Sequence, residues 1–327
     1  MLKISELDSK ILKYLLQDGR KGFAEIAEEC RVTKNKIWKR YMAMERKGII
    51  KGATIQMNFG VFGYEALATL LINVEAQQID RIMEYVEKIT EIRAYRQYNS
   101  VYNIRAVTTL RSLNQLDQIK RAIRQKLPMM SLRTSIWTDV RNMPENLNLT
   151  RTCKTPDEKW RRETKKEFES HSDRIDIDDL DLQILEKLTK DGRASFNQIA
   201  REIGTSTDTI VKRYHRMKKN GAIKISLQID PKKIGYSSIL DFNISFTLPG
   251  IKPEAVVESL AKIPDVIIIT KTSGDFDLQL TAMVRDIEQS FDLQDQIART
   301  CGVTKMEASA RKIPESWPTP QQHISTF

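Results

Sequence analysis

The chain has 327 residues, of which 40% are hydrophobic and 29% are charged, and its formal net charge is +10 at pH 7. No apolar run approaches the roughly 18 residues that cross a bilayer, and the N-terminus lacks the apolar segment of a signal peptide. The three cysteines are too few and too scattered for a disulfide framework or a cysteine-rich zinc site, so we expect Cys30 and Cys301 to be buried small residues. These features argue against membrane and disulfide-rich secreted proteins, and they predict a cytoplasmic protein of at least two domains without metal or cofactor.

The excess positive charge lies almost entirely in residues 1–150, whereas residues 177–327 carry equal numbers of basic and acidic side chains. A surplus of this kind favours an anionic partner, and the first half of the chain should attract that partner more strongly than the second. The alternative is that the charge only keeps the protein soluble.

An internal repeat relates residues 4–51 to residues 177–224. The apolar positions of the first helix recur in both copies at the spacing of a helical face. Two short motifs also recur: "DGR", at 18–20 and 191–193, follows the first helix, and "KRY", at 39–41 and 212–214, lies in the third. The chain therefore carries two versions of one structural unit.

Each repeated unit predicts three helices within about 45 residues, at 178–190, 195–203 and 207–219 in the second copy. Ser195 and Ser206 stand where N-caps would fall, and Gly204 opens the turn between the last two helices. This is the spacing of a helix-turn-helix, whose third helix enters the major groove of DNA. Arg31 replaces the turn glycine in the first copy, at a cost of roughly 1 kcal/mol if its backbone is left-handed.

The third helix is basic in both copies, which favours contact with double-stranded DNA. Side chains at its start are placed to reach base edges, and the lysines and arginines that follow are placed to reach phosphates. The alternative is a three-helix bundle with a solvated basic face. The expected DNA-binding residues are Lys34, Asn35, Lys36, Trp38, Lys39, Arg40, Ser206, Thr207, Thr209, Lys212, Arg213 and Arg216.

Beyond each helical unit the pattern predicts the order βαββαβ, which is the ferredoxin-like arrangement. The fold class is therefore α+β, with two winged helix-turn-helix domains that are each followed by a ferredoxin-like domain. Residues 148–175 are charged and lack an apolar stripe, which indicates a linker with a solvated helix near 157–170. The expected boundaries are 1–58 and 176–230 for the helix-turn-helix domains, 59–147 and 231–315 for the ferredoxin-like domains, 148–175 for the linker and 316–327 for a tail.

The stretch "LDLQILEKLTKDGRASFNQIAREIGTSTDTIVKRYHRMKKNGAI" resembles the helix-turn-helix of the Lrp/AsnC (feast/famine) transcription regulators. "TSGDFDLQLTAMV" resembles the loop and strand of that family's effector-sensing domain. The resemblance covers nearly all the chain, twice over, and implies a nucleoid-associated regulator that forms homo-oligomers through its ferredoxin-like domains. It also implies an amino-acid effector held by Thr272, Gly274, Asp275 and Asp277, whereas the first copy has lost the glycine and both carboxylates at the matching positions. A tight turn capped by its own aspartates is the alternative reading of this loop.

Two other functions remain open. Siroheme decarboxylases resemble the same two-domain pattern, and Arg93, Arg96 and Arg105 on predicted strands could bind an anion. The three histidines nevertheless lie at 171, 215 and 323, outside both predicted sensing domains, so we expect a protein that is not an enzyme. An architectural DNA-binding protein with little sequence preference is the other candidate, although the different starts of the two third helices argue against it.

Overall fold

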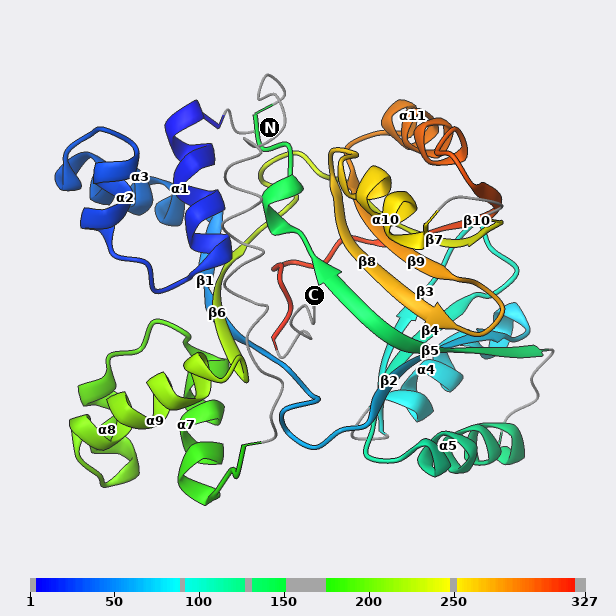
Figure 1. Cartoon of the computed structure of the whole chain (residues 1–327), viewed down its shortest axis with the longest axis horizontal. Helices are drawn as coiled ribbons and strands as arrows, with labels where there is room; N and C mark the ends of the chain where they lie inside the picture. Colours follow the sequence, from blue (N-terminus) through cyan, green and yellow to red (C-terminus); the bar gives the residue numbers. More distant parts are fainter. Residues whose placement is uncertain (1–3, 89–91, 127–130, 151–174, 248–251, 321–327) are drawn as a thin grey trace. The chain divides into compact units, whose positions relative to one another are not determined.

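The computed structural model describes residues 4–88, 92–126, 131–150, 175–247 and 252–320. The chain forms two compact units, and each contains matching parts of both repeats (Figure 1). The linker helix expected near 157–170 lies outside the described residues. The head unit is formed by the described parts of Met1–Phe62, Leu147–Tyr236 and Pro314–Phe327, and the sheet unit by those of Gly63–Asn146 and Ser237–Ile313.

The head unit contains two three-helix heads, each followed by one strand. The helices of the second head begin and end within one or two residues of the positions that the sequence predicts. The first head comprises α1 (Glu6–Gln17), α2 (Phe23–Glu29), α3 (Lys34–Arg46) and β1 (Ile50–Met57). The second head comprises α7 (Asp179–Lys190), α8 (Phe196–Ile203), α9 (Thr207–Lys219) and β6 (Ile223–Ile229).

Local signals explain where these helices start and stop. The hydroxyls of Ser195 and Ser206 accept hydrogen bonds from backbone N–H groups of α8 and α9, as N-caps do. Gly204 ends α8 with φ +79°, and Arg31 takes the same left-handed conformation in the first head with φ +54°. The expected turn therefore forms in both heads, at a cost of roughly 1 kcal/mol for the non-glycine residue.

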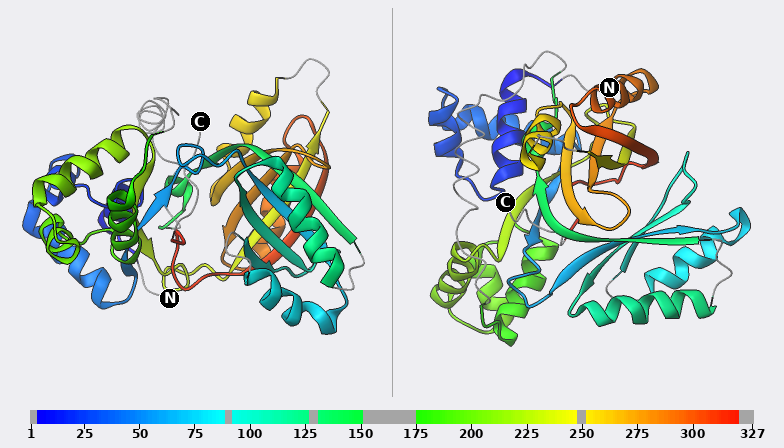
Figure 2. Two further views of the ribbon diagram at one scale, coloured as in Figure 1. Left: turned by 90° about the horizontal axis from the view of Figure 1, so that it is seen from below. Right: turned by 45° about the vertical axis from the view of Figure 1, so that its right-hand side comes forward.

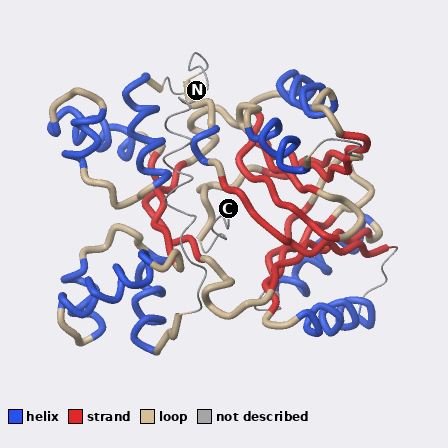
Figure 3. The backbone as a smooth tube through the Cα atoms, viewed as in Figure 1, coloured by secondary structure: helices blue, strands red, loops and turns tan. Residues whose placement is uncertain are grey.

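The strands that follow the third helices pair with each other rather than within their own heads. β1 and β6 form a two-stranded antiparallel sheet, whose register runs from Ile50 opposite Ile229 to Met57 opposite Ile223. These two strands are not among the elements that the sequence pattern predicts. Figure 3 shows them as adjacent red segments between the two groups of helices. The two heads are therefore joined by main-chain hydrogen bonds into one unit.

The sheet unit joins two βαββαβ halves in one eight-stranded sheet of order β10-β7-β9-β8-β5-β2-β4-β3. Each half has the ferredoxin-like order that the sequence predicts. The halves meet where β5 pairs antiparallel with β8, and β5 bends along its length at this junction (Figure 2). The first half comprises β2 (Ala66–Asn73), α4 (Ile79–Glu87), β3 (Ile92–Arg96), β4 (Ile104–Leu110), α5 (Leu113–Lys126) and β5 (Ser131–Asn142). The second comprises β7 (Ser238–Phe246), α10 (Pro253–Ala261), β8 (Val266–Ser273), β9 (Leu278–Val284), α11 (Ile287–Ala298) and β10 (Val303–Lys312).

The two faces of this sheet differ in polarity. Apolar residues of β2 and β4 pack with α4 and α5, and those of β7 and β9 pack with α10 and α11, which gives each half its own core. The alternate residues of the same strands include buried polar side chains, among them Thr69, Arg105, Asp241 and Gln279. Because side chains alternate between the faces of a strand, these polar side chains lie on the face turned away from the helices, together with apolar residues such as Leu71 and Met283.

Two expectations about single residues are corrected. Cys30 is half-buried and Cys301 is exposed, because Cys301 lies in the turn after α11 rather than in a core. In the tail, Trp317 is buried and pairs with Ile229 at the end of β6. No helix among the described residues is long and apolar enough to span a membrane.

Candidate nucleic-acid interface

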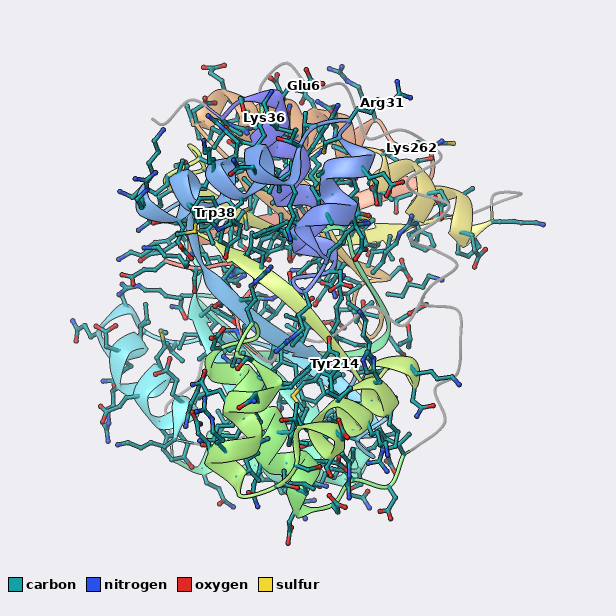
Figure 4. All side chains as sticks on the ribbon, turned by 90° about the vertical axis from the view of Figure 1, so that its left-hand side faces the viewer. Glu6, Arg31, Lys36, Trp38, Tyr214 and Lys262 are labelled. Atoms are coloured by element: carbon teal, nitrogen blue, oxygen red, sulfur yellow. The ribbon has the colours of Figure 1, made fainter. Side chains whose placement is uncertain are left out.

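The third helices expose most of the side chains expected to contact DNA. In Figure 4, Lys36 and Trp38 are labelled on α3, and Tyr214 is labelled on α9. The opposite faces of these helices are buried through Ile37 and Met44 in α3 and their counterparts in α9. The exposed members of the expected set are Lys34, Asn35, Lys36, Trp38, Lys39, Ser206, Lys212 and Arg216, whereas Arg40, Thr207, Thr209 and Arg213 are half-buried.

Arg40, the arginine of the first "KRY" motif, is engaged by its own head. Its Nε donates to Asp8 Oδ1 at 2.7 Å, and its Nη2 also bonds the Asp8 carboxylate, which is only 2% exposed at the start of α1. Burial would raise the pKa of Asp8, but hydrogen bonds from Arg40 and Ser5 hold it below its ordinary value. The ion pair therefore ties the third helix to the first.

In the second head, the equivalent ion pair between the third and first helices is part of a larger cluster of two arginines and two aspartates. Arg213 bonds the carboxylates of both Asp178 and Asp181, and Arg216 bonds Asp181 as well. Asp181 is fully buried at the start of α7, where Asp8 lies in α1 of the first head. Arg40 and Arg213 are thus retained at positions where each guanidinium pairs a buried carboxylate, and burial of that carboxylate requires such a partner.

The "DGR" motifs connect the two heads. Arg20 donates through Nη2 to Ala194 O at 2.6 Å, and its guanidinium lies 4.4 Å from the centroid of the Phe196 ring and 5.4 Å from that of Tyr214. These distances are within the range of cation–π attraction. The arginine that follows α1 therefore packs against α8 and α9 of the other head.

Arg193 makes the reciprocal contact with the first head. Its Nη1 donates to Gly19 O at 2.6 Å, and its guanidinium lies 5.2 Å from the Phe23 ring centroid and 5.5 Å from that of Tyr41. Tyr41 and Tyr214 are the tyrosines of the two "KRY" motifs. Each is therefore contacted by the arginine of the opposite head, in addition to packing in its own core.

The glycines of the "DGR" motifs allow the heads to approach closely. Gly19 N donates to Ile225 O and Gly192 N donates to Ala53 O, both at 2.8 Å. A Cβ atom added at either glycine would lie 2.9 Å from backbone atoms of β6 or β1. Only glycine fits at these two positions without a shift of the opposing strand. The contact between the heads therefore explains why both "DGR" motifs contain glycine.

One charged contact between the heads has no equivalent on the other side. Lys218 of α9 pairs with Asp18 at 2.8 Å, whereas the matching residues of the other side, Glu45 in α3 and Asp191, are both acidic. Burial raises the pKa of Tyr41; the charge of Arg193 opposes this effect, and the charges of Glu45 and Asp191 add to it. Two copies of the first head would place Glu45 and Asp18, which are both acidic, at this position on both sides, so the position disfavours pairing of two first heads.

The expected effector residues lie at the end of β8, which contains Thr272, and in the loop that leads to β9, and structural contacts involve all four. Thr272 Oγ1 donates to Phe276 O at 2.7 Å, and Asp277 Oδ2 accepts from Phe246 N at 3.0 Å. Asp275 pairs with Arg133 of β5 at 3.2 Å. A Cβ atom at Gly274 would lie 2.8 Å from Thr134 O, so the glycine permits close packing on β5.

The arginines considered for anion binding do not form one cluster. Arg96 is exposed and pairs with Asp80 at 3.4 Å, and Arg93 is also exposed. Arg105 is only 6% exposed and bonds Gln279 rather than a carboxylate. Of the histidines, only His215 lies among the described residues, and it is exposed on α9.

Comparison with known proteins agrees with this architecture. The model of the AsnC-type helix-turn-helix domain matches residues 177–218, that of the winged helix-turn-helix DNA-binding domain matches 4–51, and that of the Lrp/AsnC ligand binding domain matches 244–310. An uncharacterised HTH-type transcriptional regulator of Pyrococcus horikoshii is 32% identical over 149 residues, which cover 45% of this chain and 93% of the relative. The HTH-type transcriptional regulator FL11 of the same organism is 30% identical over 131 residues, covering 40% of this chain and 85% of the relative.

The solved structure of the siroheme decarboxylase NirDL resembles the whole chain in fold. It aligns with a TM-score of 0.62 over 99% of this chain and 94% of that chain, at 14% sequence identity. At this identity the similarity concerns the fold alone.

The paired three-helix heads and the joined ferredoxin-like halves define a duplicated winged helix-turn-helix protein. The chain belongs to the Lrp/AsnC family: helix-turn-helix models match both halves, and the ligand binding domain model matches the second half.

Proposed function

We propose that this protein is a DNA-binding transcription regulator that reads two unequal half-sites with its two heads. The observation that carries the proposal is the joining of two different basic third helices in one unit by β1–β6 pairing and by Arg20 and Arg193. The names of its relatives, which are transcriptional regulators, support the same function. Because the heads differ where bases would be read, an asymmetric operator is expected.

The proposed DNA-contacting residues fall into two groups. Lys34, Asn35 and Lys36 begin α3, and Thr207 and Thr209 follow the N-cap Ser206 in α9, so these side chains would face base edges. Trp38 adds an exposed aromatic surface to the first head only, because the matching residue is Val211. Lys39 and Lys212 would contact phosphates directly. Arg40, Arg213 and Arg216 would act mainly by fixing the third helices, since each pairs a buried carboxylate.

Selection of bound duplexes from a random pool tests this function. We expect an asymmetric consensus from the natural protein, and loss of a different half of that consensus when each head is disabled. Lys34→Ala with Lys36→Ala would disable the first head, and Thr207→Ala with Thr209→Ala the second. Protection of no defined site over competitor DNA would instead identify a nonspecific architectural protein.

We also propose an amino-acid effector and homo-oligomers formed through the sheet unit. The Lrp/AsnC ligand binding domain matched at 244–310 supports the effector, because this range includes Thr272, Gly274, Asp275 and Asp277. Calorimetric titration with single amino acids should find one that binds the natural protein and binds Asp275→Asn at least tenfold more weakly. Sedimentation analysis would give the oligomeric state. A cytoplasmic, nucleoid-associated location follows from the proposed binding to chromosomal DNA.

A second candidate function is an activity like that of siroheme decarboxylase, and the whole-chain similarity to the fold of NirDL favours it. The residues that form the sheet unit contain no histidine to donate protons in that domain pair. We therefore propose that the protein is not an enzyme. Anaerobic addition of siroheme tests the alternative, since an unchanged absorbance spectrum would remove it.

A further inference from the structure

Polar side chains connect the two halves of the sheet unit through the face that its helices leave uncovered. Thr69, Arg105 and Gln279 are each less than 7% exposed and form a chain of hydrogen bonds across the halves. Buried polar atoms in proteins nearly always have partners, so those without one require an explanation.

Arg105 and Gln279 occupy equivalent positions, since each is the second residue of its strand, in β4 and β9 respectively. Arg105 Nη2 donates to Gln279 Oε1 at 2.7 Å, and Thr69 Oγ1 donates to the same oxygen at 2.8 Å. The Thr69 hydroxyl in turn accepts from Trp137 Nε1 at 2.8 Å. Because a guanidinium can only donate, the Gln279 amide must present its oxygen to Arg105 and turn its nitrogen away.

Two donors at this point lack partners among the described residues. Arg105 Nη1 and Gln279 Nε2 are both buried and form no hydrogen bond. They belong to side chains that are bonded to each other, so they lie in the same part of the interior. Asn243, directly opposite Gln279 in the β7–β9 pairing, has an unpaired acceptor in Oδ1.

The charges around Arg105 do not balance. Asp241 accepts from Arg311 Nε and from Thr281 Oγ1, each at 2.7 Å. Burial acts first to lower the pKa of Arg105, while Asp241 and Arg311 act on it in opposite directions. The buried guanidinium of Arg105 and the half-buried guanidinium of Arg311 therefore share one carboxylate, and that carboxylate bonds Arg311. A buried cation without its own counter-charge is costly unless an anion joins it.

We propose that the interior between the two half-sheets binds one small oxyanion, of the carboxylate or phosphate type, through Arg105 Nη1 and Gln279 Nε2. Adjacent guanidinium and amide donors suit two oxygens of one such group. A hydroxyl on the anion would also satisfy Asn243 Oδ1. The site goes beyond DNA reading, and it differs from the β8–β9 loop proposed for an amino-acid effector.

Thermal unfolding of the full chain in different sodium salts tests the site. Acetate, lactate, phosphate and sulfate would each replace chloride at constant ionic strength and pH. At least one of the four should raise the Tm of the natural protein by about 5 °C at a hundred times its Kd. Acetate and lactate are carboxylates, whereas phosphate and sulfate are tetrahedral oxyanions, and only lactate and phosphate carry a hydroxyl. The order of the four Tm shifts therefore shows which type of anion binds and whether its hydroxyl contributes.

Two variants separate specific binding from general salt effects. Arg105→Met removes the charge but keeps much of the side-chain volume, and replacement of an unpaired buried cation by an apolar residue should preserve folding. Its Tm should not respond to the anion. Arg93→Met, in the neighbouring strand β3 at an exposed position, should respond as the natural protein does.

Equilibrium dialysis with the labelled anion gives a direct measure. We expect one anion per natural chain, one per Arg93→Met chain and none per Arg105→Met chain. Equal binding or equal Tm shifts in the natural protein and Arg105→Met would overturn the proposal, as would the failure of all four anions. Because neither readout involves DNA, the result is independent of the proposed regulatory function.

Discussion

Arg20 of the first head lies 4.4 Å from the ring centroid of Phe196 in the second head. Arg193 makes the matching contact with Phe23 in the first head at 5.2 Å. These reciprocal contacts explain why the "DGR" motif is repeated, because each arginine packs against the second and third helices of the opposite head. The geometry of each third helix therefore depends on residues about 170 positions away in the chain.

Removal of the first of these contacts should weaken the head unit measurably. We expect Arg20→Ala to lower the free energy of unfolding by about 2 kcal/mol, from the lost cation–π contact and the lost bond to Ala194 O. Denaturant unfolding measures the change, and a double-mutant cycle with Phe196→Leu isolates the contact between heads. Arg201→Ala, at an exposed position in α8, serves as the control and should change stability by less than about 0.5 kcal/mol.

The close approach at the second "DGR" glycine gives a steric prediction. Gly192→Ala would place a methyl group 2.9 Å from backbone atoms of Ala53 and Thr54, so we expect a loss of about 1–3 kcal/mol. Amide exchange in β1 and β6 should accelerate as the strands separate. Gly60→Ala is the matched control, because its nearest atom would be a side-chain oxygen at 3.4 Å. Similar exchange in both variants would contradict the assigned packing.

The three residues of "KRY" should separate into different functions. Lys39→Ala with Lys212→Ala should weaken binding to all DNA sequences and reduce the salt slope by about 2, since each lysine would neutralise one phosphate. The fold should be unaffected, because both side chains are exposed. Lys10→Ala with Lys190→Ala, at exposed positions of α1 and α7, removes the same charge and is the control. An unchanged salt slope in the double variant would exclude phosphate contact by these lysines.

Arg40→Ala should act mainly on stability. It leaves the buried Asp8 carboxylate without its cation, so we expect a loss of about 3 kcal/mol in the free energy of unfolding. Any effect on DNA affinity should largely disappear at temperatures where the variant is still fully folded. If DNA affinity falls strongly while stability is unchanged, Arg40 contacts the phosphate backbone instead.

The Asp8–Arg40 pair also predicts a pH dependence. The folded pKa of Asp8 is depressed, so its contribution to stability is complete above the unfolded pKa of about 3.9 and is lost as the pH falls through the folded value. The stability difference between the natural protein and Asp8→Asn should therefore shrink below about pH 4. Glu6→Gln, which changes an exposed carboxylate in the same helix, controls for general acid effects. Parallel curves for the natural protein and Asp8→Asn would contradict this assignment.

Local patterns in the sequence predict most elements of the fold. The caps at Ser195 and Ser206, the left-handed turn at Gly204 and the order of strands and helices in each ferredoxin-like half all agree with the structure. These features depend on residues close together in the chain, so their signals can be read without knowledge of distant contacts. β1 and β6 were missed because their pairing partner lies in the other repeat.

The sequence by itself determined that the chain is duplicated, that each copy has a basic third helix, and that the two copies differ where bases would be read. Only the tertiary structure decided how individual polar side chains are used. Arg40 and Lys39 are adjacent in one motif, yet one pairs a buried carboxylate and the other is exposed. Likewise Arg93 is exposed, whereas Arg105 is buried without a carboxylate of its own. The physical reason is that the partner of a charged group is set by neighbours in space, and these come from other helices, strands and repeats.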